Sequence, residues 1–349
     1  MATHEREITA PVDLCLADGR LDPAAVGWSR RPLHRSRIPG WGRVKRWEYW
    51  CVTTPTHLIA LTVSDLDYLA LSSVYVLEFG PGRRREFERT SITPGGLGVH
   101  LPDRVAGSRG SPPVVVGPAR PVRGQVRIGI TDAGGATRLT ARCMGPGRLP
   151  VEADLLVAMP EGHETLSVVV PWSDRRFQYT SKHTARPARG TLTVGDDVLE
   201  FGDGAWAVLD HGRGRWPRRV DWNWGAASGR TDGHTVGLQL GGRWTRGTGS
   251  TENALCVDGR LSKIGQELDW HRSARDPMSP WTIHGGHSSR VELEFTPFHV
   301  RHAHTDLGVI SNRTDQCFGH FTGTIRSDDG QRIEVDRLLG WAEAVAMRW

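Results

Sequence analysis

The sequence predicts an all-β protein of two antiparallel domains, each a barrel or a sandwich, and three observations predict it. Apolar or alternating runs of four to eight residues, rich in β-branched and aromatic side chains, recur along the 349 residues and end at Gly, Asp, Asn or Pro. Asp-Gly and Gly-Gly dipeptides, which suit tight hairpin turns, separate several of these runs. A helical period of 3.6 residues is missing, except for about one turn near Leu338–Met347.

The predicted strands follow one another along the whole chain. In the first half they are Glu48–Thr53, His57–Val63, Ser73–Phe79, Gln125–Thr131, Ala153–Ala158 and Leu166–Pro171. In the second half they are Thr191–Val194, Ala205–Leu209, Thr235–Leu240, Val291–Phe295, Gly319–Arg326 and Arg332–Val335. Because one open antiparallel sheet of this size would expose long edges, we expect the strands to close into barrels or to stack as sandwiches.

The length suits two domains of medium size. The polar segment Ser181–Gly190, which contains Arg and Pro, is interpreted as a linker or long loop near the middle of the chain. It divides the chain into an N-terminal β domain of residues 1–185 and a C-terminal β domain of residues 186–349.

Composition and charge exclude several classes of protein. A hydrophobic fraction of 38% and a charged fraction of 24% argue against disorder, and no apolar run approaches the roughly eighteen residues of a membrane span. The net charge of +5 would suit nucleic acid, but acidic and basic residues are mixed along the chain. All but three of the 44 basic residues are arginines, as codon bias produces, so no nucleic-acid partner is expected. The lysines are Lys45, Lys182 and Lys263.

The cysteines and the N-terminal residues indicate a cytoplasmic protein. The five cysteines are scattered without a C-x-x-C pair, which favours a reducing compartment over a disulfide framework. The first residues are polar and show no signal peptide. The alternating pair His302 and His304 suits zinc or copper, but no third ligand has a recognisable spacing, so neither a metal nor a cofactor is predicted.

Residues 190–259 concentrate the candidate functional side chains. The 14 tryptophans of the chain outnumber its Tyr 4 and Phe 8 together, and several of them lie in this segment beside acids and glycines. If Asp221–Gly225 is extended, Asp221 and Asn223 face one side of the strand while Trp222 and Trp224 face the other. In a barrel, one of these two rows faces a cavity.

Long strings of the chain resemble a known bacterial family. The strings are GRLDPAAVGWSRRPL near the start, WNWGAASG and GSTENALCVDGRLSKI in the second half, and FTGTIRSDDGQRIEVDRLLGWAE near the end. They are similar to the family called domain of unknown function 2804. The resemblance extends nearly from end to end and implies a family without implying an activity.

A shorter run, GTLTV…GAWAVLDHGRGRW…VDWNWGAAS…DGHTVGLQL, is similar to the second half of the carotenoid 1,2-hydratases and AttH-like proteins. That resemblance implies two lipocalin-like (calycin-type) antiparallel β domains packed together. It places the family's Asp-His pair on Asp210 and His211. In the hydratases a tryptophan follows two places after this histidine, whereas this chain has Arg213 there and its next tryptophan at Trp216.

Hydration of an alkene needs an acid strong enough to protonate carbon and a dry pocket that holds the resulting cation. Burial raises the pKa of a carboxyl group toward that task, and aromatic faces stabilise positive charge. The candidate catalytic residues are therefore Asp210, His211, Asp221 and Glu252. The candidate ligand-binding residues are Trp206, Trp216, Trp222, Asn223, Trp224 and Asn253.

Each candidate also has an ordinary structural interpretation. Asp210 and His211 would then form a turn in which the aspartate caps backbone amides. Trp222 and Trp224 would pack in the core, because tryptophan buries a large area. Glu252 and Asn253 would hydrogen-bond backbone groups across the barrel.

Together these observations predict a protein that binds an apolar small molecule of isoprenoid, polyketide or fatty-acyl type in a barrel cavity. If it is an enzyme, we expect acid-initiated hydration or cyclisation without a redox cofactor. The alternatives are a non-catalytic carrier or sensor on the same scaffold and a structural protein whose barrels are filled by side chains. A cavity that holds a carboxyl group of raised pKa would favour the enzyme.

Overall fold

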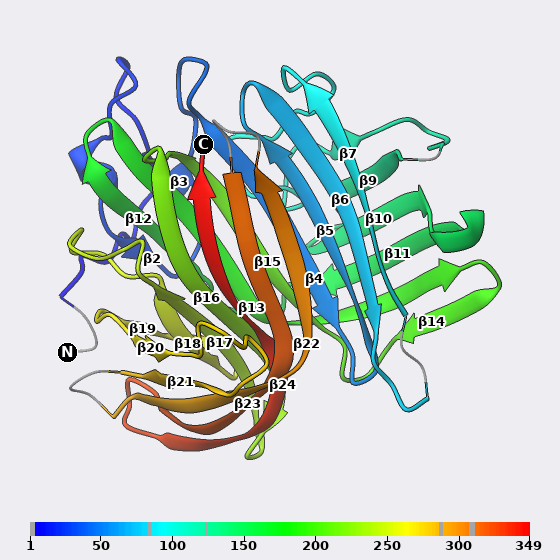
Figure 1. The fold of residues 1–349 in the computed structure, drawn as a ribbon. Helices are drawn as coiled ribbons and strands as arrows, with labels where there is room; N and C mark the ends of the chain where they lie inside the picture. Colours follow the sequence, from blue (N-terminus) through cyan, green and yellow to red (C-terminus); the bar gives the residue numbers. More distant parts are fainter. Residues whose placement is uncertain (1–3, 83–84, 123, 286–288, 307–310) are drawn as a thin grey trace.

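A computed structural model describes residues 4–82, 85–122, 124–285, 289–306 and 311–349. It confirms the predicted all-β fold class: two large, curled antiparallel sheets follow one another along the chain (Figure 1). The described residues contain no helix long and apolar enough to cross a membrane. Short 3-10 helices occur at Pro23–Ala25 and Pro146–Arg148, and a small two-stranded sheet pairs β1 (Val12–Asp13) with β3 (His34–Arg35).

The first large sheet has 13 strands, and its main path runs β7-β6-β5-β4-β15-β13-β11-β10-β9-β8. The strands of this path are β4 (Lys45–Thr53), β5 (His57–Asp65), β6 (Leu69–Glu78), β7 (Arg85–Pro94), β8 (Val114–Val116), β9 (Val126–Asp132), β10 (Ala136–Met144), β11 (Pro150–Ala158), β13 (Arg176–Val194) and β15 (Trp206–Arg215). Three more join it at the side, namely β2 (Trp28–Ser29), β12 (Leu166–Ser173) and β14 (Asp197–Phe201).

The second large sheet has nine strands in the order β19-β18-β17-β16-β24-β23-β22-β21-β20. They are β16 (Arg219–Thr231), β17 (His234–Gly242), β18 (Asn253–Val257), β19 (Arg260–Ile264), β20 (Asp269–His271), β21 (Trp281–His284), β22 (Val291–Asp306), β23 (Ser311–Arg326) and β24 (Arg332–Arg348). Its three longest strands, β22 to β24, bring residues from the end of the chain against β16, the first strand of this sheet.

Two local expectations were wrong. The segment Ser181–Gly190 lies inside the long strand β13, where most of its polar side chains are buried rather than exposed as a linker would have them. A β-bulge between His183 and Arg186, with Ala185 at positive φ, interrupts β13. The part before the bulge pairs with β12, and the part after it pairs with β11. The expected helical turn near Leu338–Met347 lies within the extended strand β24.

The change from one sheet to the other falls between Arg215, the end of β15, and Arg219, the start of β16. The predicted domains of residues 1–185 and 186–349 would divide the chain inside β13. A boundary at the 216–218 connection follows the sheets instead, and we propose it as the place where the two domains meet.

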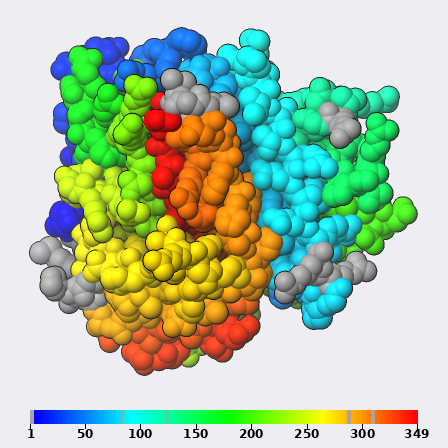
Figure 2. Space-filling view, viewed as in Figure 1, coloured from blue at the N-terminus to red at the C-terminus, as the bar shows by residue number. Residues whose placement is uncertain are grey.

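Each sheet curls around its own apolar core, so the faces that meet between the sheets are their outer faces. A third cluster joins them and contains Cys51, Tyr75, Phe318 and Trp341, contributed by both sheets. The backbone N–H of Ala185 donates to Ser228 Oγ across this contact at 2.8 Å. In Figure 2 the orange surface of β22 lies directly against the blue-to-cyan surface of β5 to β7. Arg301 of β22 and Glu88 of β7 form an ion pair across this contact.

Candidate functional site

A cavity of about 310 Å³ lies between the outer faces of the two sheets. The first sheet contributes side chains of β4, β5, β6, β13 and β15 to its wall, and the second contributes side chains of β16, β22, β23 and β24. The connection between β17 and β18 adds Trp244 and Glu252, and the C-terminal Trp349 lies on the wall as well. Residues far apart in the chain therefore share one site.

Strand β15 shows how the sequence shapes the cavity. Asp210 lines the wall, and the alternation of an extended strand places Gly212 and Gly214 on the same face. A Cβ on Gly212 would stand 2.2 Å from the ring of Trp47, and one on Gly214 would stand 2.2 Å from Gln178 Oε1. The bare backbone at these two positions therefore gives Trp47 and Gln178 the space they occupy.

The buried end of the cavity holds an ammonium group between carboxyl groups. Lys182 Nζ lies 2.9 Å from Asp210 Oδ1 and 3.2 Å from Glu252 Oε1, and it stands 4.2 Å above the ring of Trp224. Burial opposes the charge of Lys182, but Asp210 and Glu252 outweigh it and raise the pKa of the ammonium group. Burial also raises the pKa of Glu252, although Lys182 acts in the opposite direction.

Glu343 provides a second carboxyl group in the same wall. Trp222 Nε1 donates to its Oε1 at 2.9 Å, and Gln316 Nε2 donates to its Oε2 at 3.3 Å. Burial raises the pKa of Glu343 to about 7, and these contacts and the charge of Lys182 only partly counter it. No ion pair of Glu343 occurs among the described residues. Near neutral pH about half of the molecules therefore carry a protonated Glu343 carboxyl group in the cavity wall.

Tryptophans form the aromatic part of the wall, with Trp216 at their centre. The ring centroid of Trp216 lies 5.1 to 6.4 Å from those of five others, namely Trp47, Trp172, Trp222, Trp244 and Trp349. Its indole nitrogen donates to Gln178 Oε1 at 2.7 Å, which fixes its orientation. Large rings held in this way offer a flat apolar surface and negative faces to a ligand.

Five of the ten candidate residues line the cavity: Asp210, Trp216, Trp222, Trp224 and Glu252. The predicted alternation along Asp221–Gly225 is present in β16, and it is the tryptophan row that faces the cavity. The polar row lies on the other face of the sheet. There Asp221 is exposed and forms an ion pair with Arg243 at 2.9 Å, while Asn223 Nδ2 donates to the Glu343 carbonyl oxygen at 3.3 Å.

The remaining three candidates, His211, Asn253 and Trp206, also lie outside the cavity wall. His211 points into the core of the first sheet, where its Nδ1 lies 2.7 Å from Glu48 Oε1. Asn253 links backbone groups, as its structural interpretation predicted: its Oδ1 accepts from Gly241 N at 2.6 Å. Trp206, at the start of β15, is half-buried and lines a separate groove with Gly204 and Pro187.

Sequence reasoning missed Lys182, Glu343, Gln316 and Trp47. One signal could have found the lysine, because all three lysines of this arginine-rich chain are buried. Where codon bias favours arginine at exposed positions, the few remaining lysines mark buried positions that need a compact ammonium group. Glu343 and Gln316 lie in strands without an unusual motif, and only the pairing of β23 with β24 brings them together.

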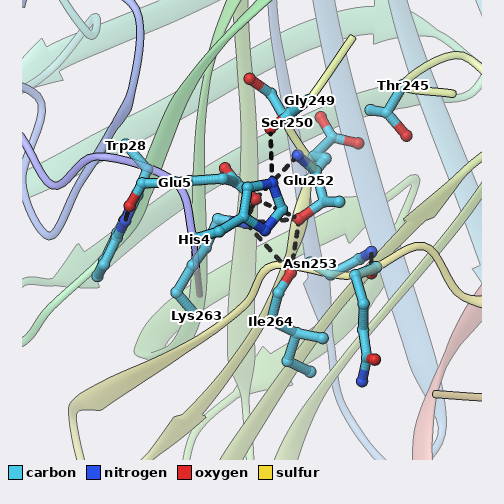
Figure 3. Close-up of polar contacts among 12 residues, drawn as sticks. His4, Glu5, Trp28, Thr245, Gly249, Ser250, Glu252, Asn253, Lys263 and Ile264 are labelled. Atoms are coloured by element: carbon cyan, nitrogen blue, oxygen red, sulfur yellow. Dashed lines mark hydrogen bonds and ion pairs between the residues drawn. The ribbon is translucent and has the colours of Figure 1, made fainter. Parts of the chain in front are cut away.

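A second buried lysine lies near Glu252, outside the cavity wall (Figure 3). Lys263 Nζ contacts Glu5 Oε1 at 2.7 Å and Thr251 Oγ1 at 2.6 Å, so the N-terminal segment is tied to the second sheet. Burial lowers the pKa of Lys263, and Glu5 opposes that effect. This contact fixes the residues that precede Glu252 and thereby supports one side of the site.

The site is thus a cavity between two curled β-sheets, with an aromatic wall and buried carboxyl groups. The chain belongs to the family described as domain of unknown function (DUF2804), whose profile matches residues 5–349. The predicted membership is thus confirmed. A search of curated proteins returned no match.

Several solved structures are similar to this chain. An AttH-like protein from Nitrosomonas europaea is 14% identical, with 86% of this chain and 92% of that chain covered and a TM-score of 0.49. CghA with Sch210972 is 11% identical, with coverages of 90% and 89% and a TM-score of 0.44. Kievitone hydratase from Nectria haematococca is 8% identical, with coverages of 90% and 91% and a TM-score of 0.46.

Proposed function

We propose that the protein binds an apolar small molecule in the cavity between its sheets and converts it by acid-initiated hydration or cyclisation. The observation that carries this proposal is Glu343, a buried carboxyl group whose pKa is raised to about 7 in a wall of tryptophans. A cavity of about 310 Å³ is at the lower end of the size range of small-molecule sites. An isoprenoid, polyketide or fatty-acyl compound has the apolar surface that such a wall accepts.

Glu343 is the proton donor in this proposal. Its protonated carboxyl group gives a proton to one carbon of a C=C bond, and the other carbon becomes cationic. Trp222 and Trp224 line the cavity, and their aromatic rings can stabilise that charge. Asp210 and Glu252, which both contact Lys182, lie at the same end of the cavity.

Two outcomes balance the reaction. In hydration, a water molecule adds to the cationic carbon and returns one proton to the Glu343 carboxylate, so the product gains H and OH. In cyclisation, a second C=C bond of the same molecule attacks the cation, and a neighbouring carbon loses a proton to the carboxylate. Both leave the enzyme unchanged and need no oxidant or reductant.

Isotopes distinguish these outcomes from simple binding. Purified protein is incubated with geranylgeraniol and, separately, with a bacterial lipid extract, in water, in D₂O and in H₂¹⁸O, and the products are analysed by mass spectrometry. Hydration adds one water whose oxygen carries the label, whereas cyclisation gives an isomer that contains one deuterium. Binding without any new product would make the protein a carrier, and failure to retain any apolar compound would favour the structural alternative.

Site variants connect the activity with the cavity. Glu343→Gln keeps the shape of the side chain but removes the acid, so we expect turnover to fall by about 100-fold or more while binding persists. Glu334→Gln, an exposed position on the same strand, is the control and should retain full activity. Unchanged turnover in Glu343→Gln would rule out the acid mechanism.

A further inference from the structure

Three side chains with metal-binding atoms converge on strands β22 and β23, away from the cavity. His302 and His304 are two residues apart in β22 and therefore face the same side of the sheet. Asp315 of β23 is the direct cross-strand partner of His302. Among the described residues this is the one group of three potential ligands whose donor atoms all lie within 4.8 Å of one another.

The distances suit a single ion. Asp315 Oδ1 lies 2.7 Å from His302 Nδ1 and 3.6 Å from His304 Nε2. Zinc binds nitrogen and carboxylate oxygen at about 2.0–2.2 Å in tetrahedral geometry, which separates two ligand atoms by about 3.3 Å. The two observed distances lie on either side of that value, so small side-chain rotations would place all three atoms around one ion.

The surroundings leave room and access. The Asp315 side chain is 10% exposed, which holds the carboxylate in place, whereas the side chains of both histidines are about half exposed. Across the ladder Asp315 pairs with Ala344, and Arg313 pairs with Ala346. Arg313, the cross-strand partner of His304, is exposed as well. Because both histidines are about half exposed, an ion could enter from solvent and keep a water molecule at its fourth position.

We propose that His302, His304 and Asp315 form a binding site for a divalent zinc ion. Two imidazoles and one carboxylate form a donor set that zinc commonly takes. The bound ion would link the end of β22 to the beginning of β23. This site is independent of the proposed function, because Thr314 and Gln316, the neighbours of Asp315, point to the opposite face and line the cavity.

The test uses the full chain, stripped of metal and free of any purification tag. Calorimetric titration with zinc chloride should give one bound ion per chain. His304→Ala and Asp315→Asn should each weaken the affinity by about 100-fold or more, because each removes one of three ligands. His271→Ala is the matched control: His271 lies beside His284 with ring centroids 6.4 Å apart, but this pair belongs to no such group of three among the described residues.

Cobalt provides a second readout that does not depend on stability. Co²⁺ bound by His302, His304 and Asp315 should show the visible absorption of a four-coordinate site, and His302→Ala should abolish it while circular dichroism stays unchanged. Glu343→Gln should retain full zinc affinity, so a failure of the acid mechanism leaves this site testable. Zinc binding that survives Asp315→Asn combined with His304→Ala, or that needs His271, would overturn the proposal, as would the lack of a stoichiometric site.

Discussion

Lys182 shows why a buried charge at this site has to be a lysine. Its ammonium group contacts Asp210 and Glu252 and stands over Trp224, so three partners share one compact cation. A guanidinium group is larger and planar and would not fit the same point. Both of these carboxyl groups pair with Lys182, whereas Glu343 forms no ion pair among the described residues.

Removal of Lys182 is expected to destabilise the protein strongly. Lys182→Met leaves Asp210 and Glu252 buried without their cation, and the loss should be on the order of 3–5 kcal/mol at pH 8. Asp210→Asn in the same chain should recover part of that loss. Urea denaturation of the single and double variants measures the coupling, and strictly additive effects would show that the pair does not interact.

The raised pKa of Glu343 predicts a specific pH dependence of stability. The folded protein holds this proton up to about pH 7, whereas the unfolded chain releases it near pH 4.5. Folding therefore binds a proton between these values, and the free energy of unfolding falls as pH rises from 5 to 8. Glu343→Gln should reduce this decline by up to about 3 kcal/mol. The exposed control Glu334→Gln should keep the wild-type slope in denaturation curves at pH 5, 6, 7 and 8.

At the scale of elements, the alternation of side chains along a strand was predictable, but which face of the strand lies toward the cavity was not. The sequence indicated that Asp221 and Trp222 face opposite sides of β16, and they do. Which side faces the cavity depends on how the outer faces of the two sheets meet, and no local pattern encodes that. The same limit hid Lys182, because a polar run is ordinarily exposed and β13 buries it between two sheets.

The glycines of β15 carry a testable consequence of this packing. Gly212→Ala would place a methyl group 2.2 Å from the Trp47 ring, so the ring has to move into the cavity or out of the wall. We expect a loss of about 1–3 kcal/mol and weaker retention of apolar compounds. Gly202, which has no atom within 4 Å of an added Cβ, serves as control. Gly202→Ala should change the free energy of unfolding by less than about 0.5 kcal/mol.

At the scale of the whole molecule, earlier parts of the chain are tied to the second sheet at several points outside the cavity wall. Glu5 reaches Lys263 of the second sheet, and Arg30 donates to the Leu261 carbonyl oxygen at 2.5 Å. The contact of Ala185 with Ser228 adds a third link. The prediction of all-β architecture from turns and short strands was correct because those signals are local, whereas these ties join residues up to 258 positions apart.

Loss of one tie should therefore weaken both sheets together. Glu5→Ala leaves Lys263 buried without its carboxylate partner, at an expected loss on the order of 3 kcal/mol. Thermal unfolding followed by tryptophan fluorescence and by far-ultraviolet circular dichroism should show one coincident transition at a lower temperature. Two separated transitions would indicate sheets that unfold independently. Lys263→Met in the Glu5→Ala background should restore part of the stability.

The tryptophan cluster around Trp216 has an optical consequence. Five indole rings within 5.1 to 6.4 Å of a sixth are close enough to exchange excitation energy and to couple their transitions. The near-ultraviolet circular dichroism of this protein should therefore contain a strong coupled signal that originates at the cavity wall. A compound that enters between the rings alters that signal, so the protein reports occupancy of its own site without any attached label.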